Sequence, residues 1–232
     1  MQRFQIFWHN LQQDLKIFLY FTILFSVFRL IFIGIFNTYL SDCTMQDILL
    51  CQWYGFRLSL KTAGMIALIG GVWGTLPQIG FIKWPSEIIR KIWSALMVLI
   101  FTIAFFARIP YFEIFNSGFN IMLINGVHDD WGAILDTAIN EYGLLWRLPL
   151  AFLMTGILIW LLLKFLNIKT RPAKITNSRQ LFFAVVRVII VLPIFFVFVR
   201  YGGAFNYANS INFESAERLK SAFLNEAILD DG

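Results

Sequence analysis

IFLYFTILFSVFRLIFIGIF, residues 17–36, contains one charged residue, Arg29, in a run long enough to cross a bilayer as a helix. Hydropathy finds four comparable runs further along the chain. We therefore predict an all-α integral membrane fold with five transmembrane helices. Their expected bounds are about 17–36, 62–82, 92–109, 145–163 and 181–199.

The composition of the whole chain agrees with this class of fold. Of its 232 residues, 59% are hydrophobic and only 14% are charged. A soluble domain has roughly 25% charged residues, so this chain has too few charges to cover a surface that faces water. For the net charge of +5, the location of the basic residues matters more than the total. We therefore expect membrane lipids as partners, and no nucleic acid.

The positions of Lys and Arg predict the direction of insertion, because short basic loops stay in the cytoplasm. With an internal N-terminus, the inner segments contain Asp14 and Glu87 as their acids. Their basic residues are Arg3, Lys16, Lys83, Arg90, Lys91, Lys164, Lys169, Arg171, Lys174 and Arg179. KFLNIKTRPAKITNSR, residues 164–179, is the strongest of these anchors. We predict that the N-terminus lies inside the cell and the C-terminus outside.

Two segments are predicted to form amphipathic helices. Residues 1–16 have an apolar stripe of helical spacing and are expected to lie on the membrane surface; the alternative is an extension of the first span. HDDWGAILDTAINEYG, residues 128–143, predicts a helix over about 130–142 on the outer surface. Asp129 or Asp130 is placed to cap it, so we expect no metal site at His128.

Small residues in the predicted second span indicate close helix packing. Gly64, Gly70, Gly71 and Gly74 fall within a few turns, and Gly70 and Gly74 form a pair of small residues at the spacing that brings helices together. Cys43 and Cys51, both in the first outer loop, are candidates for a disulfide. The alternative is that helix geometry keeps the two thiols apart.

Cations recur where the predicted spans meet the outer surface. They are Arg57, Lys61, Arg108, Arg147 and Arg200. Arginine binds phosphate oxygens with two donors, so we form the hypothesis that this ring holds an anionic lipid headgroup; the alternative is ordinary snorkelling. Arg29, inside the first span, is expected to face the bundle or a wet cavity, paired with a lipid phosphate or a carboxylate.

Catalytic signatures are missing from these residues. There is no phosphate-binding glycine loop and no GxSxG elbow, and His9 and His128 are the only histidines. The chain therefore offers no complete set of catalytic groups and no metal site of its own.

Several short motifs resemble the N-terminal membrane domain of the lipoteichoic acid synthase family, which are phosphoglycerol transferases. YGFRLSLK (54–61) resembles the segment that enters the family's second helix, and ARIPYFEIF (107–115) resembles the aromatic stretch that leaves the third. RYGGAF (200–205) resembles the Arg-Gly motif after the fifth helix. SAFLNEAILDDG (221–232) resembles the helix that leads toward the external catalytic domain.

The resemblance implies a place and an activity. It implies a bacterial cell (inner) membrane protein in which residues 17–200 anchor, and 201–232 lead to, an extracellular or periplasmic sulfatase-like domain that is absent from this chain. That domain would carry a threonine nucleophile with Mn or Mg and transfer glycerol phosphate from phosphatidylglycerol. The catalytic domain, on the same chain or a separate one, is then an expected partner.

Other functions stay open. The related phosphoethanolamine transferases share the plan of five helices and a sulfatase-like domain. A small transporter and a non-catalytic membrane scaffold are further alternatives.

Overall fold

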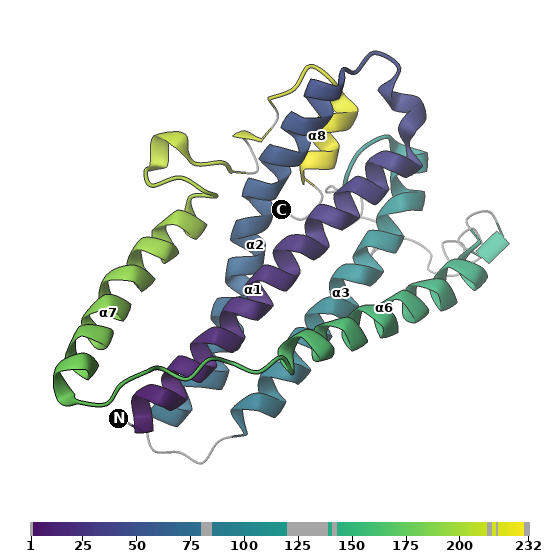
Figure 1. Cartoon of the computed structure of the whole chain (residues 1–232). Coiled ribbons are helices and arrows are strands. Elements are labelled where there is room, and N and C mark those ends of the chain that lie inside the picture. The colour runs from purple at the N-terminus through teal and green to yellow at the C-terminus, as the bar shows by residue number, and fades with distance from the viewer. Residues whose placement is uncertain are drawn as a thin grey trace, which may run out of the picture.

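The computed structural model describes residues 2–79, 85–119, 139–140, 143–212, 215–216 and 218–229. Within these residues every regular element is a helix. The long helices are α1 (Gln2–Ile35), α2 (Met45–Ile79), α3 (Ser86–Phe115), α6 (Leu144–Leu166) and α7 (Ser178–Arg200) (Figure 1). The short ones are η1 (Asn37–Leu40), η3 (Tyr207–Asn209) and α8 (Ala222–Ile228).

Four of the long helices, α1, α3, α6 and α7, are long and apolar enough to cross a membrane. Large apolar side chains on α6 and α7 are more than half exposed, among them Leu153, Trp160, Phe182 and Ile189, as expected of residues that face lipid. The expected second span, 62–82, lies partly outside the described residues, and α2 is not one of the four. A membrane-spanning helical chain is therefore supported, by four helices.

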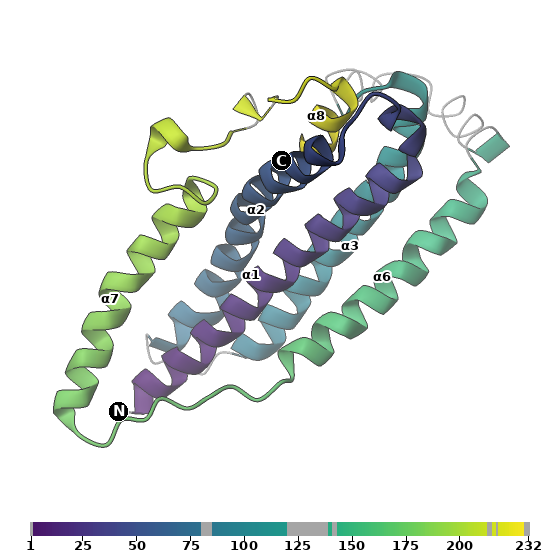
Figure 2. The ribbon, with the colours of Figure 1, turned by 45° about the horizontal axis from the view of Figure 1, so that its top comes forward.

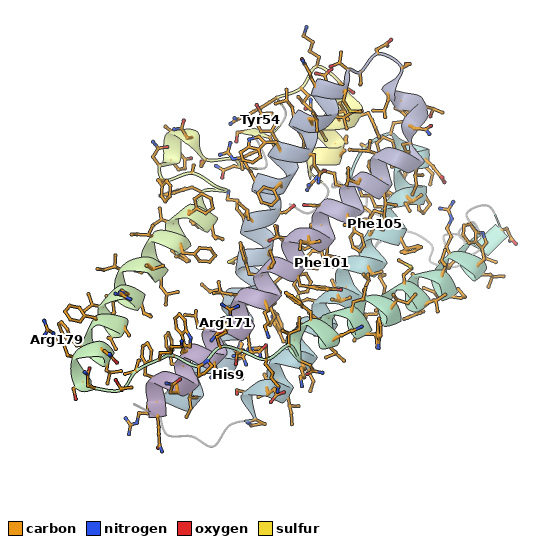
Figure 3. The ribbon with its side chains drawn as sticks, viewed as in Figure 1. His9, Tyr54, Phe101, Phe105, Arg171 and Arg179 are labelled. Atoms are coloured by element: carbon orange, nitrogen blue, oxygen red, sulfur yellow. The ribbon has the colours of Figure 1, made fainter. Side chains whose placement is uncertain are left out.

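The helices α1, α2 and α3 pack along one another, α6 lies against α3 and α1, and α7 lies beside α2 (Figures 1 and 2). Aromatic rings fill the space between α1 and α3. Phe28 stacks on Phe105 with ring centroids 4.5 Å apart, and Phe25 meets Phe101 edge-on at 4.8 Å (Figure 3). Helix association in lipid depends on such close packing, because lipid tails are as apolar as the side chains.

The long helices alternate in direction, so the chain's two terminal segments lie at opposite ends of the bundle (Figure 1). One end carries the start of α1 and the connection between α6 and α7, residues 167–177, which we call the strap. The other end carries α8, and we call it the α8 end.

The N-terminal residues differ from the expected surface helix. Residues 2–35 form one continuous helix, which corresponds to the alternative of an extended first span. The polar face of its first turns binds the strap. Gln5 exchanges hydrogen bonds with the backbone of Ala173, donating at 2.6 Å and accepting at 3.0 Å. Gln12, two turns further on, donates to and accepts from the backbone of Arg171, with both distances 2.9 Å.

Further polar contacts fasten the strap. His9 Nδ1 lies 2.7 Å from the hydroxyl of Thr170, and Lys16 donates to the carbonyl oxygen of Ile168 at 2.5 Å. Figure 3 shows His9 and Arg171 together at this end of α1. The polar side chains on this face of α1 form their hydrogen bonds with the strap and not with water. The first turns can therefore continue the span as one helix.

The C-terminal segment also differs from an external linker. The helix α8 packs on α2 and α1, and its side chains Phe223, Leu224, Ala227 and Ile228 are buried. Phe223 lies 5.8 Å from Phe32, ring centroid to ring centroid. Residues 201–232 were expected to lead away from the membrane domain, but at least 222–228 belong to its core. The apolar face of this short helix is the physical reason.

Two expectations fall on residues that the structure does not describe. The outer-loop helix predicted over about 130–142 lies outside the described residues except for Ile139 and Asn140, which are helical. His128, Asp129 and Asp130 lie outside them entirely.

Candidate functional site

The candidate site begins with Arg29, which lies on α1 with its side chain fully buried at the α8 end. Its Nε donates to the carbonyl oxygen of Ala227 at 3.1 Å, and its Nη2 donates to the Ser59 hydroxyl at 3.0 Å. Gly55 makes room for the guanidinium, since a Cβ there would lie 2.1 Å from Arg29 Cζ. The sequence predicted that Arg29 faces the bundle, but not that a helix carbonyl would be its partner.

Arg108, on α3, approaches the same helix from another side. Its side chain is buried, its Nη2 donates to the carbonyl oxygen of Glu226 at 2.6 Å, and its guanidinium lies 4.3 Å from the centre of the Phe32 ring. Glu226 and Ala227 belong to the last turn of α8, where the helix dipole is negative and the carbonyls lack the usual helical donors. The Glu226 carbonyl also accepts from the backbone N–H of Leu229. Arg29 and Arg108 thus cap the C-terminal end of α8.

Two cations of α2 bind the connection between α7 and α8. Arg57 donates to the carbonyl oxygens of Gly202 and Asn209 at 2.6 and 2.5 Å. Lys61 donates to Ile211 and to the Asn212 side chain. Burial lowers the pKa of Lys61, and the nearby Arg200 and Arg57 lower it further, so three positive charges lie close together here.

The remaining cations of the predicted ring lie apart from α8. Arg147, on α6, pairs with Glu113 of α3 at 3.3 Å. Arg200, at the end of α7, is exposed near Lys61. The ring of cations is therefore not a single lipid-facing set. Arg29, Arg57, Lys61 and Arg108 bind the chain's own carbonyl oxygens, and Arg200 is turned to the surroundings.

A pocket opens beside Arg57 at the α8 end. It has a volume of about 510 Å³ and is lined by Trp53, Arg57, Phe205, Asn209, Arg218 and their neighbours. Arg218 donates from Nε to the carbonyl oxygen of Ser215 and lies over the Tyr54 ring. Two guanidiniums between aromatic side chains suit an anionic headgroup with an apolar stem. Sequence reasoning did not select Arg218, whose place depends on the fold of the C-terminal segment.

A second polar cluster lies toward the strap end of the bundle. Arg90 Nε is 2.7 Å from Asp14 Oδ1, and Thr75 donates to Asp14 Oδ2 at 3.0 Å. A Cβ added at Gly71 would lie 3.0 Å from Asp14, and one added at Gly74 would lie 3.1 Å from Arg90. The α2 glycines thus admit polar side chains from α1 and α3.

The other two α2 glycines admit apolar and aromatic neighbours. A Cβ on Gly70 would lie 2.9 Å from Trp93, whose ring nitrogen donates to the carbonyl oxygen of Ile66, and one on Gly64 would lie 2.3 Å from Val199. All four glycines therefore lie at helix contacts.

Cys43 and Cys51 are free thiols in the structure. Cys51 is buried and its Sγ lies 3.4 Å from the carbonyl oxygen of Leu224, so it also contacts α8. In the described part of the chain no group of three or more His, Cys, Asp or Glu gathers as a metal site.

Fold and site together define an α-helical membrane bundle whose C-terminal segment is bound at one end by buried cations. Comparison with protein-family models, curated proteins and solved structures gave no match.

Proposed function

We propose that this chain is the membrane domain of a phosphoglycerol transferase of the lipoteichoic acid synthase type. In this proposal five helices cross a bacterial cell membrane with the N-terminus inside and the α8 end outside. The bundle anchors a sulfatase-like catalytic domain at the outer surface and positions the anionic phospholipid that donates the phosphoglycerol group.

The observation that supports the proposal best is the attachment of the C-terminal segment. Arg29, Arg57, Lys61 and Arg108 all donate to oxygens of residues 202–227. A segment fixed in this way would hold a following domain at a constant height and orientation. A tether that keeps a catalytic domain at the headgroup level raises its effective concentration there, and a fixed orientation lowers the entropic barrier of the transfer.

The pocket beside Arg57 supplies the second part of the proposal. Arg218 and Arg57 would bind the phosphate of the donor lipid, while Trp53 and Phe205 lie against its glycerol and upper acyl carbons. Lipid exchange from the bilayer would then deliver the donor directly below the catalytic domain.

The activity is tested on the natural full-length protein, with any external domain that it carries, in liposomes containing Mn²⁺. Labelled phosphatidylglycerol should release diacylglycerol as its glycerol phosphate is transferred to a lipid-anchored glycerol acceptor supplied in the same liposomes. Release from phosphatidylethanolamine alone would replace the proposal by a phosphoethanolamine transferase. Ion or solute flux without lipid turnover would replace it by a transporter. If neither lipid turnover nor flux is detected, the non-catalytic scaffold is the remaining alternative.

The role of the pocket has its own test. Arg218→Gln should raise the KM for phosphatidylglycerol with little change in kcat, because Arg218 is proposed to bind the donor and not to take part in the chemistry. Arg187→Gln, an exposed arginine on α7, is the matched control. Equal KM values for Arg218→Gln and wild type would contradict this use of the pocket.

The orientation is tested separately by cysteine labelling from outside intact cells. In a chain whose Cys43 and Cys51 are replaced by alanine, a cysteine introduced at Tyr207, which is exposed at the α8 end, should react with an impermeant maleimide. One introduced at Lys174 in the strap should not. Labelling at position 174 and not at position 207 would contradict the proposed orientation and, with it, the proposed function.

A further inference from the structure

We propose that a groove between α1, α2 and α7 holds one acyl chain of an anionic membrane phospholipid. This inference goes beyond the transfer reaction and does not require it, because it concerns how a lipid is retained between helices. Phosphoglycerol transfer by the full-length protein could fail while the groove still holds its lipid.

The groove exists because α7 is attached to the bundle over a short part of its length. Val199 packs on Gly64 of α2, and the ring of Phe195 meets Phe18 of α1 edge-on at 5.3 Å. Next to these contacts lies a cavity of about 550 Å³, lined from α1, α2 and α7. Figures 1 and 2 show α7 standing to one side of the other helices.

The lining of the groove offers too few polar groups to bind ordered water. Apart from Asp14 and Thr75, the residues that line it are apolar, among them Leu68, Val72 and Phe196. Asp14 and Thr75 are already hydrogen-bonded to each other, and Asp14 also to Arg90. A buried water needs two to four polar partners, which these walls do not provide.

The length of the groove suits an acyl chain. The α2 residues that line it, Gly64 to Thr75, rise about 16 Å along the helix axis, roughly the hydrocarbon depth of one leaflet. One acyl chain of a phospholipid spans this same depth, so a single chain can lie along the whole length of the groove.

Charge at the end of the groove favours an anionic lipid. Lys61 lies one turn before Gly64 on α2, and Arg200 directly follows Val199 on α7. The two cations are near enough that Arg200 lowers the pKa of Lys61 after the larger effect of burial. Arg200 is exposed, so its guanidinium is placed to meet the phosphate of a lipid whose chain descends the groove.

The experiment uses the purified chain in liposomes with phosphatidylglycerol that carries a diazirine on one acyl chain. After irradiation, peptide mapping should place most cross-links on Leu68, Val72 and Phe196. Phosphatidylcholine with the same labelled chain should mark these residues far less. Equal labelling by the two lipids, or labelling of the exposed α6 residue Leu153 as strong as that of Leu68, would overturn the proposal.

Substitutions that fill the groove provide a second test. Leu68→Trp and Val72→Trp should lower cross-linking at Phe196 about tenfold, the change expected when roughly two methylenes lose their site. Met65→Trp, on the same helix but outside the groove, should leave it unchanged. Arg200→Gln should reduce the preference for phosphatidylglycerol over phosphatidylcholine.

Two further outcomes count against the proposal. Undiminished cross-linking in Leu68→Trp would show that the chain does not lie in the groove. A cysteine placed at Leu68 that forms a disulfide between two copies of the chain, with no lipid adduct on wild type, would assign the groove to a second copy. The mapping on wild type stands even if a tryptophan variant fails to fold.

Discussion

Arg29 and Ala227 are 198 residues apart in the chain, yet the guanidinium of the first donates to the carbonyl oxygen of the second at 3.1 Å inside the bundle. This bond ties the first transmembrane helix to the last helix of the described chain. Because Arg29 is buried, replacing it removes hydrogen bonds that water cannot replace, and the α8 end should depend on it more than on any surface charge.

Arg29→Gln should therefore destabilise the protein by about 3 kcal/mol, the scale of a buried hydrogen-bonded charge. The midpoint of thermal unfolding, followed by tryptophan fluorescence in detergent, should fall by roughly 6–12 °C on a scale of ~2–4 °C per kcal/mol. Arg187→Gln, on the exposed face of α7, should change it by little. Equal midpoints for the two variants would show that the contact with Ala227 adds no stability.

Gly55→Ala should resemble the loss of Arg29, because the new methyl group would lie 2.1 Å from Arg29 Cζ and displace the guanidinium. Gly34→Ala is the matched control, since nothing lies within 4 Å of a Cβ there. That substitution should stabilise α1 by about 0.5–1 kcal/mol, through helix propensity alone. Gly55→Ala in the Arg29→Gln background should cost much less than in wild type. Additive effects would contradict the steric explanation.

Arg90→Gln should cost about 3–5 kcal/mol, because it leaves the Asp14 carboxylate buried without its cation. Glu87→Gln breaks the exposed pair with Lys91 on the same helix and should cost less than about 0.5 kcal/mol. Unfolding midpoints in detergent compare the two. If Asp14→Asn fully restores the stability of Arg90→Gln, the cost came from the unpaired charge; if it restores none, packing of Arg90 against Gly74 is the larger effect.

Gln5→Ala and Gln12→Ala together should release the strap from α1, since each glutamine exchanges two hydrogen bonds with its backbone. Hydrogen exchange at Arg171 and Ala173 should then rise about tenfold or more, as their amides lose their partners. Gln2→Ala, exposed one turn earlier, is the control. Unchanged exchange in the double variant would mean that other contacts hold the strap.

The stability of the folded protein should depend on pH through the carboxyl group of Asp47. Hydrogen bonds from the Thr44 backbone and hydroxyl lower the pKa of Asp47 below its ordinary value of 3.8 and cap the start of α2. A lowered pKa in the folded state means that the contribution to stability is present above the ordinary pKa and is lost as the pH falls through the folded one. Asp47→Asn should flatten the fall of the unfolding midpoint below about pH 4. An identical acid profile in the variant would contradict the cap.

The apolar runs predicted the long helices because a bilayer requires consecutive apolar residues, a requirement visible in any single stretch. The helix boundaries were less accessible. Gln5 and Gln12 are polar residues of an extended helix only because the strap, some 160 residues later, accepts and donates in their place.

The candidate site shows the same division. The positions of Arg57, Lys61, Arg108, Arg147 and Arg200 predicted a ring of cations at one membrane face. The type of each residue, however, does not say whether its partner is a lipid phosphate or a carbonyl oxygen. Both are oxygen acceptors of partial or full negative charge. Only the fold of α8 against Arg29 and Arg108 separates the two, and Arg218 enters the pocket through that same fold.

The docking of α8 has a consequence for biosynthesis. Ribosomes deliver Arg29 to the membrane long before residues 222–228 exist, so the arginine must wait for its carbonyl partners while four more long helices are made. A chain stalled before α8 would lack the carbonyl oxygens of Glu226 and Ala227 that Arg108 and Arg29 bind. Completion of α8 is therefore the step after which quality control should cease to recognise this part of the nascent bundle.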